Sequence, residues 1–159
     1  MLRFSVLTLV CFAFASCDAV SIGEAQQAFE LAALGAPSGY TNTDAQGRVI
    51  SEDAQDWTIS PVHQSSFTLT FPPYPNPASP TESIRFAGVY SAGGSGLVPY
   101  RINARGNLEQ IRPVTGSQDG SAPAFSFTAG QLGSIGLERV VLLDFEGRFV
   151  TYGDIQVIP

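Results

Sequence analysis

Lysine is absent from this sequence of 159 residues, and histidine occurs only once. The eight cationic residues, all arginine, stand against 14 acidic ones, so the formal net charge is −6. A nucleic-acid-binding domain needs a basic surface, which this composition lacks. One histidine and two cysteines do not supply the three or four ligands of a zinc site. We therefore predict no nucleic-acid partner, no metal and no other cofactor.

Charged residues are also scarce, at 14% of the chain, whereas hydrophobic residues make up 44%. This balance excludes a charge-rich disordered chain and a coiled coil. The 16 glycines and 11 prolines favour many turns between short strands. A chain of this length fits one ordinary domain with small attachments, and it can bury a core without disulfides.

Residues that could carry out catalysis are few and scattered. A Ser-His-Asp triad would have to use His63, which we predict to be an exposed histidine in a polar loop. Asp53 and Asp56 do not have the spacing of a calcium-binding loop and are predicted to be exposed turn residues. We place the remaining candidate acids on the solvent-exposed faces of strands: Glu82, Glu109, Glu138 and Asp144. No reaction is indicated, and we predict that the protein is not an enzyme.

The first 16 residues are predicted to be a signal peptide. Arg3 precedes an uncharged run from Phe4 to Phe14, which is too short to span a bilayer as a helix. The run ends in Phe14-Ala15-Ser16-Cys17, which resembles a bacterial lipobox and implies a lipid on Cys17, the mature N-terminus. Cys11 lies in the segment that would be removed. The alternative is ordinary cleavage after Ala15, following an A-x-A pattern.

Residues 17–56 are predicted to form a short helix and a linker. Between Val20 and Leu34 the residues are good helix formers, Ser21 and Glu24 fit a capping box, and Gly35 fits a helix end. We expect this helix to lie on its own domain, with a stalk or partner-binding element as the alternative. The segment that follows, up to Asp56, is rich in turn-forming residues.

From Trp57 to the C-terminus, hydrophobic and polar residues alternate with a period of two in several short segments. This is the pattern of strands with one buried and one wet face, as in Phe67, Leu69 and Phe71. The run from Val140 to Leu143 is continuously apolar, as in a central strand covered on both faces. Turns recur about every ten residues. Residues 57–159 are therefore predicted to be a mainly β, antiparallel sandwich of the immunoglobulin type.

One proline-rich segment carries a family resemblance. The stretch Tyr74-Pro75-Asn76-Pro77, followed by a polar turn and by Ile84-Arg85-Phe86, resembles the opening of type A C-terminal sorting domains of the type IX secretion system. It is also similar to the immunoglobulin-like domain of flagellar hook-capping proteins. The resemblance covers residues 74–159 and implies an immunoglobulin-like fold and a role in sorting. The site residues it implies are Tyr74, Pro75, Asn76, Pro77, Ile84 and Phe86.

The same prolines have a purely physical reading. Pro75 and Pro77 restrict the backbone and cannot donate to a strand ladder, so they would deliver a stiff segment to the first strand of the sandwich. On this alternative reading the segment is a joint without a recognition role.

Together these features predict a non-catalytic lipoprotein of the cell envelope, in the outer membrane, that displays its sandwich for structural or adhesive contacts. Its partners would be the membrane, through the lipid on Cys17, and an envelope protein or a glycan. The alternative is a secreted binding module, delivered by its C-terminal domain. A carbohydrate ligand for that module would stack on aromatic residues such as Tyr74, but we expect these side chains to pack in the core or at strand edges.

Overall fold

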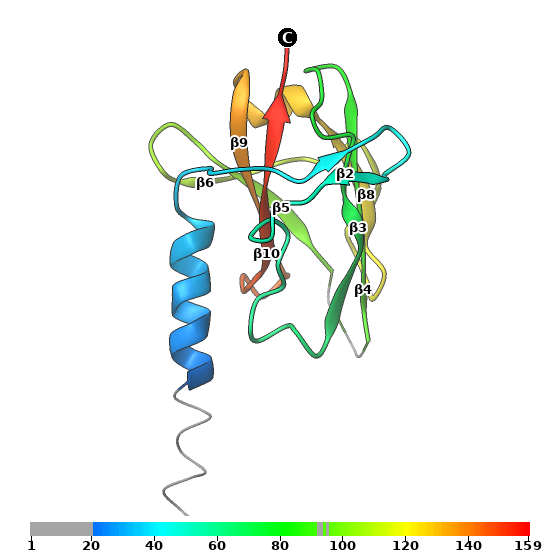
Figure 1. Cartoon of the computed structure of the whole chain (residues 1–159). Coiled ribbons are helices and arrows are strands. Elements are labelled where there is room, and N and C mark those ends of the chain that lie inside the picture. Colours follow the sequence, from blue (N-terminus) through cyan, green and yellow to red (C-terminus); the bar gives the residue numbers. More distant parts are fainter. Residues whose placement is uncertain (1–20, 92–93, 95) are drawn as a thin grey trace, which may run out of the picture.

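The computed structural model describes residues 21–91, 94 and 96–159. The predicted signal peptide, 1–16, and Cys17 lie outside these residues. A helix occupies residues 21–33, and the chain beyond it is built mainly of strands (Figure 1). Within the described residues no helix is long and apolar enough to cross a membrane.

Two four-stranded antiparallel sheets form the body of the molecule. The first has the order β10-β9-β5-β6 and the second the order β3-β4-β8-β7. In chain order the strands are β3 (Phe67–Tyr74), β4 (Ser83–Tyr90), β5 (Val98–Ile102), β6 (Leu108–Gln110), β7 (Thr115–Ser117), β8 (Ala124–Thr128), β9 (Gly136–Leu143) and β10 (Phe149–Val157). The second sheet, β3-β4-β8-β7, corresponds to the A-B-E-D sheet of an immunoglobulin sandwich. The first sheet corresponds to the G-F-C sheet, with β6 as one extra strand beside C. The predicted fold class is confirmed.

Two smaller elements complete the structure. β1 (Asn42–Thr43) and β2 (Val49–Ser51) form a two-stranded sheet, and η1 (Ala129–Leu132) is a short 3-10 helix after β8. Figure 1 shows that the C-terminus lies at the end of the sandwich opposite the first described residues of the helix.

The core lies between the two sheets and follows the predicted alternation. In β4, Ile84 and Phe86 are buried while Ser83 and Arg85 are exposed. Phe125 of β8 stacks on Phe86 with ring centroids 5.2 Å apart. Since side chains of a strand point alternately to its two faces, the period of two in the sequence fixes which residues enter this core.

The continuously apolar strand β9 is covered on both faces, as predicted. Val140 and Leu142 belong to the core between the sheets. Val141 and Leu143 face the other way and cluster with Ala33 of the helix. Phe29 of the helix packs nearby, with its ring 5.0 Å from that of Tyr152 in β10. The helix therefore lies on its own domain, which explains why β9 has no polar side in its second half.

Strand β3 departs from the predicted alternation. Phe67 and Leu69 pack on the core, but the pairing with β4 shifts register between Leu69 and Phe71. One extra residue in β3 turns the following side chains to the other face, so Phe71 lies opposite Ala87 on the outer surface. The prediction that Phe71 shares the buried face with Phe67 was wrong, because the alternation breaks at a bulge that hydrophobicity alone does not reveal.

The edge of the first sheet is protected by chain that precedes the sandwich strands. The outer side of β10 receives hydrogen bonds from backbone amides of Trp57, which donates to Tyr152 O at 2.8 Å, and Ser60, which donates to Val150 O at 2.8 Å. The Asp56 carboxylate accepts from Asp154 N. An exposed nine-residue edge would invite pairing with other chains, and these contacts occupy it.

Candidate functional site

The proline-rich motif lies inside the sandwich, as the connection between β3 and β4. The strand that follows it is therefore not the first strand, and that part of the prediction was wrong. The peptide bonds Tyr74-Pro75 and Asn76-Pro77 are both cis. Asn76, Ile84 and Phe86 are buried, at 0%, 0% and 2% exposure. Tyr74, Pro75 and Pro77 are half-buried, so among the site residues implied by the resemblance only these three reach the surface.

Asn76 connects three segments of the chain. Its Nδ2 donates to Thr41 O and to Asp154 O, each at 2.9 Å, and its Oδ1 accepts from Gln156 N at 2.9 Å. Its backbone exchanges hydrogen bonds with Thr43 at 2.7 and 3.2 Å. Through these side-chain and backbone hydrogen bonds, Asn76 holds β1, β10 and the β3–β4 connection together. This geometry gives Asn76 a structural role, and the sequence pattern alone did not indicate its partners.

Tyr74, in contrast, borders a hollow on the outer surface of the second sheet. We call this hollow, of about 420 Å³, the outer-face groove. It is defined by Phe71 and Tyr74 of β3, Arg85 and Ala87 of β4, Thr115 of β7 and Ser126 of β8. The two aromatic rings meet edge to face, 5.0 Å apart at 71°. The bulge in β3 is what turns Phe71 into this groove.

The floor of the outer-face groove is made of small residues. Gly116 of β7 has φ of +89°, and a Cβ there would lie 2.1 Å from Ala124 O, so no side chain can stand at this point. Thr115 Oγ1 and Ser126 Oγ share a hydrogen bond of 2.7 Å and present hydroxyl groups beside it. The result is a shallow trough with aromatic and hydroxyl walls.

Arg85 stands over this trough. Its Cζ lies 5.7 Å from the centroid of the Tyr74 ring, within the range of a cation–π contact. Among the described residues no carboxylate is within ion-pair distance of Arg85. An exposed guanidinium beside two rings and two hydroxyl groups can donate hydrogen bonds to the oxygens of a polar ligand whose apolar face rests on the rings.

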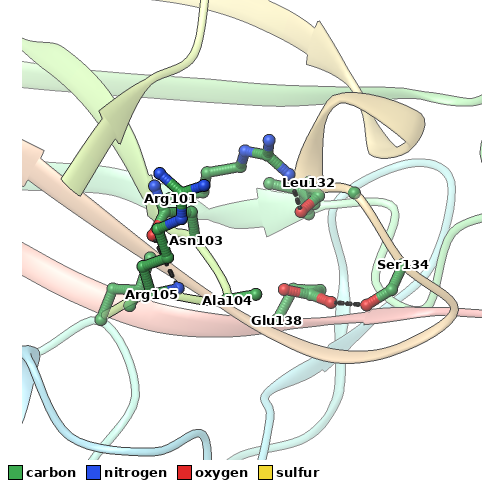
Figure 2. Close-up of a pocket in the computed structure, with 9 residues that line it drawn as sticks. Arg101, Asn103, Ala104, Arg105, Leu132, Ser134 and Glu138 are labelled. Atoms are coloured by element: carbon green, nitrogen blue, oxygen red, sulfur yellow. Dashed lines mark hydrogen bonds between the residues drawn. The ribbon is translucent and has the colours of Figure 1, made fainter. Parts of the chain in front are cut away.

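A second hollow, of about 510 Å³, lies beside the β5–β6 hairpin (Figure 2). Arg101 borders it but is engaged, donating to Leu132 O at 2.8 Å and to Glu109 at 3.0 Å. Ser134 hydrogen-bonds to Glu138 on the opposite wall. Two of its charged side chains, Arg101 and Glu138, are thus engaged by neighbours, and the hollow lacks the aromatic surface of the outer-face groove.

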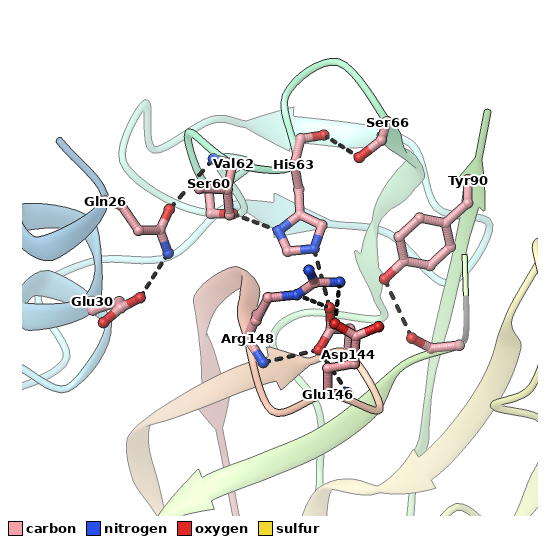
Figure 3. Close-up of polar contacts among 11 residues, drawn as sticks. Gln26, Glu30, Ser60, Val62, His63, Ser66, Tyr90, Asp144, Glu146 and Arg148 are labelled. Carbon is pink, nitrogen blue, oxygen red and sulfur yellow. Dashed lines mark hydrogen bonds and ion pairs between the residues drawn. The ribbon is translucent and has the colours of Figure 1, made fainter. Parts of the chain in front are cut away.

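His63 is not the exposed loop residue that we predicted. It is only 5% exposed, and its Nδ1 lies 2.9 Å from Ser60 Oγ while its Nε2 lies 3.4 Å from Asp144 Oδ2 (Figure 3). The prediction failed because the loop folds against the β9–β10 hairpin, a long-range contact that local composition does not encode. Asp144, predicted on a wet face, is likewise buried, at 3% exposure.

These three residues have the composition of a hydrolase triad but lack its accessibility. Ser60 is 0% exposed, so a substrate carbonyl cannot reach its hydroxyl. Asp144 is occupied by the hairpin turn: its Oδ1 accepts from Glu146 N and Arg148 N, both at 2.9 Å, and its Oδ2 accepts from the Arg148 guanidinium at 2.7 Å. Burial alone would raise the pKa of Asp144, but these bonds from Arg148 hold it below its usual range.

A second buried polar cluster attaches the helix and the segment after it. Arg139 of β9 pairs with Asp154 of β10, and both are almost fully buried. The same guanidinium donates to Ala32 O at 2.7 Å and to Ala36 O at 3.3 Å, at the C-terminal end of the helix. It also lies over the Tyr152 ring, 4.7 Å from the centroid. One arginine thereby joins helix and sheet.

Asp56 belongs to the same region and is half-buried, not an exposed turn acid as predicted. Its two oxygens accept from Thr41 N at 2.8 Å and from Asp154 N at 2.6 Å. Burial raises the pKa of Asp56 to about 6, against the opposing effect of these hydrogen bonds. Within the part of the chain that is described, no three His, Cys, Asp or Glu side chains gather closely enough to hold a metal ion.

Comparison with known proteins adds no relative: no family model matches this chain, and no curated protein matches it. The candidate site therefore stands on its own geometry, and we assign it to the outer-face groove.

Proposed function

We propose that this protein is a non-catalytic lipoprotein of the cell envelope, anchored in the outer membrane by a lipid on Cys17, that displays its sandwich for structural or adhesive contacts. The observation that carries the proposal is the attachment of the helix. Ser21, in the helix, follows Cys17 by four residues. The helix is fixed to the first sheet by Phe29, Ala33 and the Arg139 contacts. A lipid at Cys17 would thus hold the whole sandwich directly at a membrane.

The non-catalytic part of the proposal is supported by the use of the polar residues. Ser60, His63 and Asp144 are buried and joined to one another, and Arg139 and Asp154 hold the helix. Side chains that would be the first choice for acid–base or nucleophilic chemistry are thus committed to the fold. The accessible groove offers rings, hydroxyl groups and a guanidinium, which suit binding.

The chemical modification of the mature N-terminus tests the proposal. The full chain is expressed in a bacterium with labelled fatty acid, and the mature protein is examined by mass spectrometry. We expect a diacylated or triacylated N-terminus at Cys17, since two or more acyl chains give stable anchoring. Cys17→Ser should abolish labelling and release the protein from the membrane, while the matched control Cys11→Ser should leave both unchanged. An unmodified N-terminus at Ser16 would refute lipid anchoring.

The outer-face groove favours a second candidate, a secreted module that binds carbohydrate and is delivered by its C-terminal domain. Sugar rings stack their C–H faces on aromatic side chains while their hydroxyls hydrogen-bond to polar ones, and Phe71, Tyr74 and Arg85 offer both. On a glycan array, Phe71→Ser and Arg85→Ala should each abolish any signal, while the control Phe145→Ser, a change of an exposed ring outside the groove, should keep it. A signal that survives both groove variants would exclude the groove as the binding site.

A further inference from the structure

Exposed apolar side chains stand on four segments at the end of the sandwich where the helix begins. Ile22 is 52% exposed, Val62 44%, Val89 48% and Phe145 49%. Ile22 stands on the helix, Val62 in the loop before β3, Val89 at the end of β4 and Phe145 in the β9–β10 turn. We call these four side chains the tether-end patch.

The segments that carry the patch are joined to one another. Val62 N donates to Gln26 Oε1 of the helix at 3.4 Å, and His63, the next residue, reaches Asp144 beside Phe145 (Figure 3). Ser91, just after β4, donates from its backbone amide to Ser66 O at 2.9 Å. Helix, loop, strand end and hairpin turn therefore form one end surface, and Figure 1 shows them on the side opposite the C-terminus.

The position of this end relative to a membrane follows from chain length. Four residue steps separate Cys17 from Ser21, and even a fully extended chain covers only about 14 Å in four steps. The helix then runs about 20 Å along the sheet, at 1.5 Å per residue. A lipid on Cys17 consequently keeps the start of the helix within about 14 Å of the bilayer, and the patch lies at this end of the molecule, opposite the C-terminus.

We infer that the tether-end patch docks into the headgroup region of the bilayer that holds the Cys17 lipid, so that the sandwich stands with a fixed end on the membrane. This inference rests on the lipid anchor of the proposed function. The occupant is a lipid surface because the short tether brings that surface to the patch.

Apolar contact, not charge, accounts for this docking. The charged groups around the patch are mainly acidic: Glu24 is exposed, and Arg148 is paired with Glu146 at 3.0 Å and with Asp144. An anionic membrane attracts clusters of basic residues, and the described residues at this end form no such cluster. Docking should therefore occur on phosphatidylcholine, a zwitterionic lipid without net charge, and should be insensitive to salt.

The test uses tryptophan as a depth reporter in the mature lipoprotein, purified from membranes and reconstituted into phosphatidylcholine vesicles with brominated acyl chains. Trp57 is buried and present in every variant, so the parent protein supplies the background. The reporters are Phe145→Trp in the patch and Ile158→Trp at the opposite end, where Ile158 is 39% exposed. We expect the added emission at 145 to fall at least twofold in brominated vesicles and that at 158 to stay unchanged.

A patch variant and a matched control complete the design. Val62→Ser, added to the Phe145→Trp chain, should weaken the quenching, whereas Ile50→Ser, which removes an even more exposed side chain from β2, should not. Equal responses of the two reporters, or no response at 145, would overturn the docking while leaving the lipid anchor in place. If mass spectrometry of the same preparation finds no lipid on Cys17, the proposed function falls as well.

Discussion

Replacing Asn76 by alanine tests whether the proline-rich motif is a structural clamp. The amide of Asn76 makes three hydrogen bonds to backbone groups of residues 41, 154 and 156, and the residue is fully buried. Alanine lacks the side-chain amide, so all three hydrogen bonds are lost and no new one replaces them. The change leaves Gln156 N without its acceptor and two backbone carbonyls with one partner fewer.

The expected loss follows from the number of bonds. A typical hydrogen bond contributes about 1 kcal/mol net, and a donor left buried without a partner costs about 1–3 kcal/mol. We therefore expect Asn76→Ala to lower the free energy of unfolding by roughly 3–5 kcal/mol, a large part of the 5–15 kcal/mol typical of a domain. Asn76→Asp should cost more, because a carboxylate would face the carbonyl oxygens of Thr41 and Asp154.

Urea unfolding followed by Trp57 fluorescence measures these changes, since Trp57 is buried and packs on the core. The control is Asn107→Ala, which alters an exposed asparagine in the β5–β6 turn and should change stability by no more than about 0.5 kcal/mol. If Asn76→Ala lost less than about 1 kcal/mol, the clamp would be refuted. The motif would then need another explanation, with recognition the leading one.

Three further predictions concern the attachment of the helix and the segment after it. Arg139→Met should destabilise the fold by about 3–5 kcal/mol in urea unfolding, because it leaves Asp154 buried without its partner; Arg139→Met combined with Asp154→Leu should recover much of that loss, and failure to recover would refute the pairing argument. Gly153→Ala should also be strongly destabilising, since a Cβ would lie 2.3 Å from the Trp57 ring and 2.6 Å from Asp56 Oδ1, whereas Gly120→Ala, where φ is positive but no atom lies within 4 Å, should cost far less in the same assay. The raised pKa of Asp56, about 6, means that the folded state binds a proton more readily than the unfolded state, so this group's contribution to stability is present below pH 4 and is lost as pH rises through 6. Asp56→Asn should flatten the pH dependence of unfolding between pH 4 and 6, and an unchanged slope would contradict the assignment.

The sequence predicted those parts of the fold that depend on local pattern. The predicted alternation holds in β4, and the continuous run from Val140 to Leu143 identified a strand covered on both sides. Glu146-Gly147 is a turn-forming pair, and in the structure it joins β9 to β10, with φ of +81° at Gly147. In each case the preference is set within a few residues, so no knowledge of distant segments was needed.

What could not be predicted depends on contacts between distant segments. His63 and Asp144 are 81 residues apart in sequence, and only the packing of the loop on the hairpin turn makes both buried. The outer-face groove requires the bulge in β3, because without the register shift Phe71 would point into the core. The adjacent Pro72-Pro73 pair was the one available signal, since two residues without backbone N–H interrupt strand pairing.

The attachment of the helix also determines which surfaces a tethered molecule presents. Because Val141 and Leu143 are buried by the helix, the outer face of the first sheet is occupied by the protein's own chain. None of the described segments covers the outer face of the second sheet in this way, and that face carries the groove of Phe71, Tyr74 and Arg85. A sandwich has only two broad faces, and the helix lies on one of them. The groove-bearing face is therefore the one that is open to a partner approaching from the side. The asymmetry between the faces arises from one helix of 13 residues, 21–33, and that helix is the element a lipid on Cys17 would hold at the membrane.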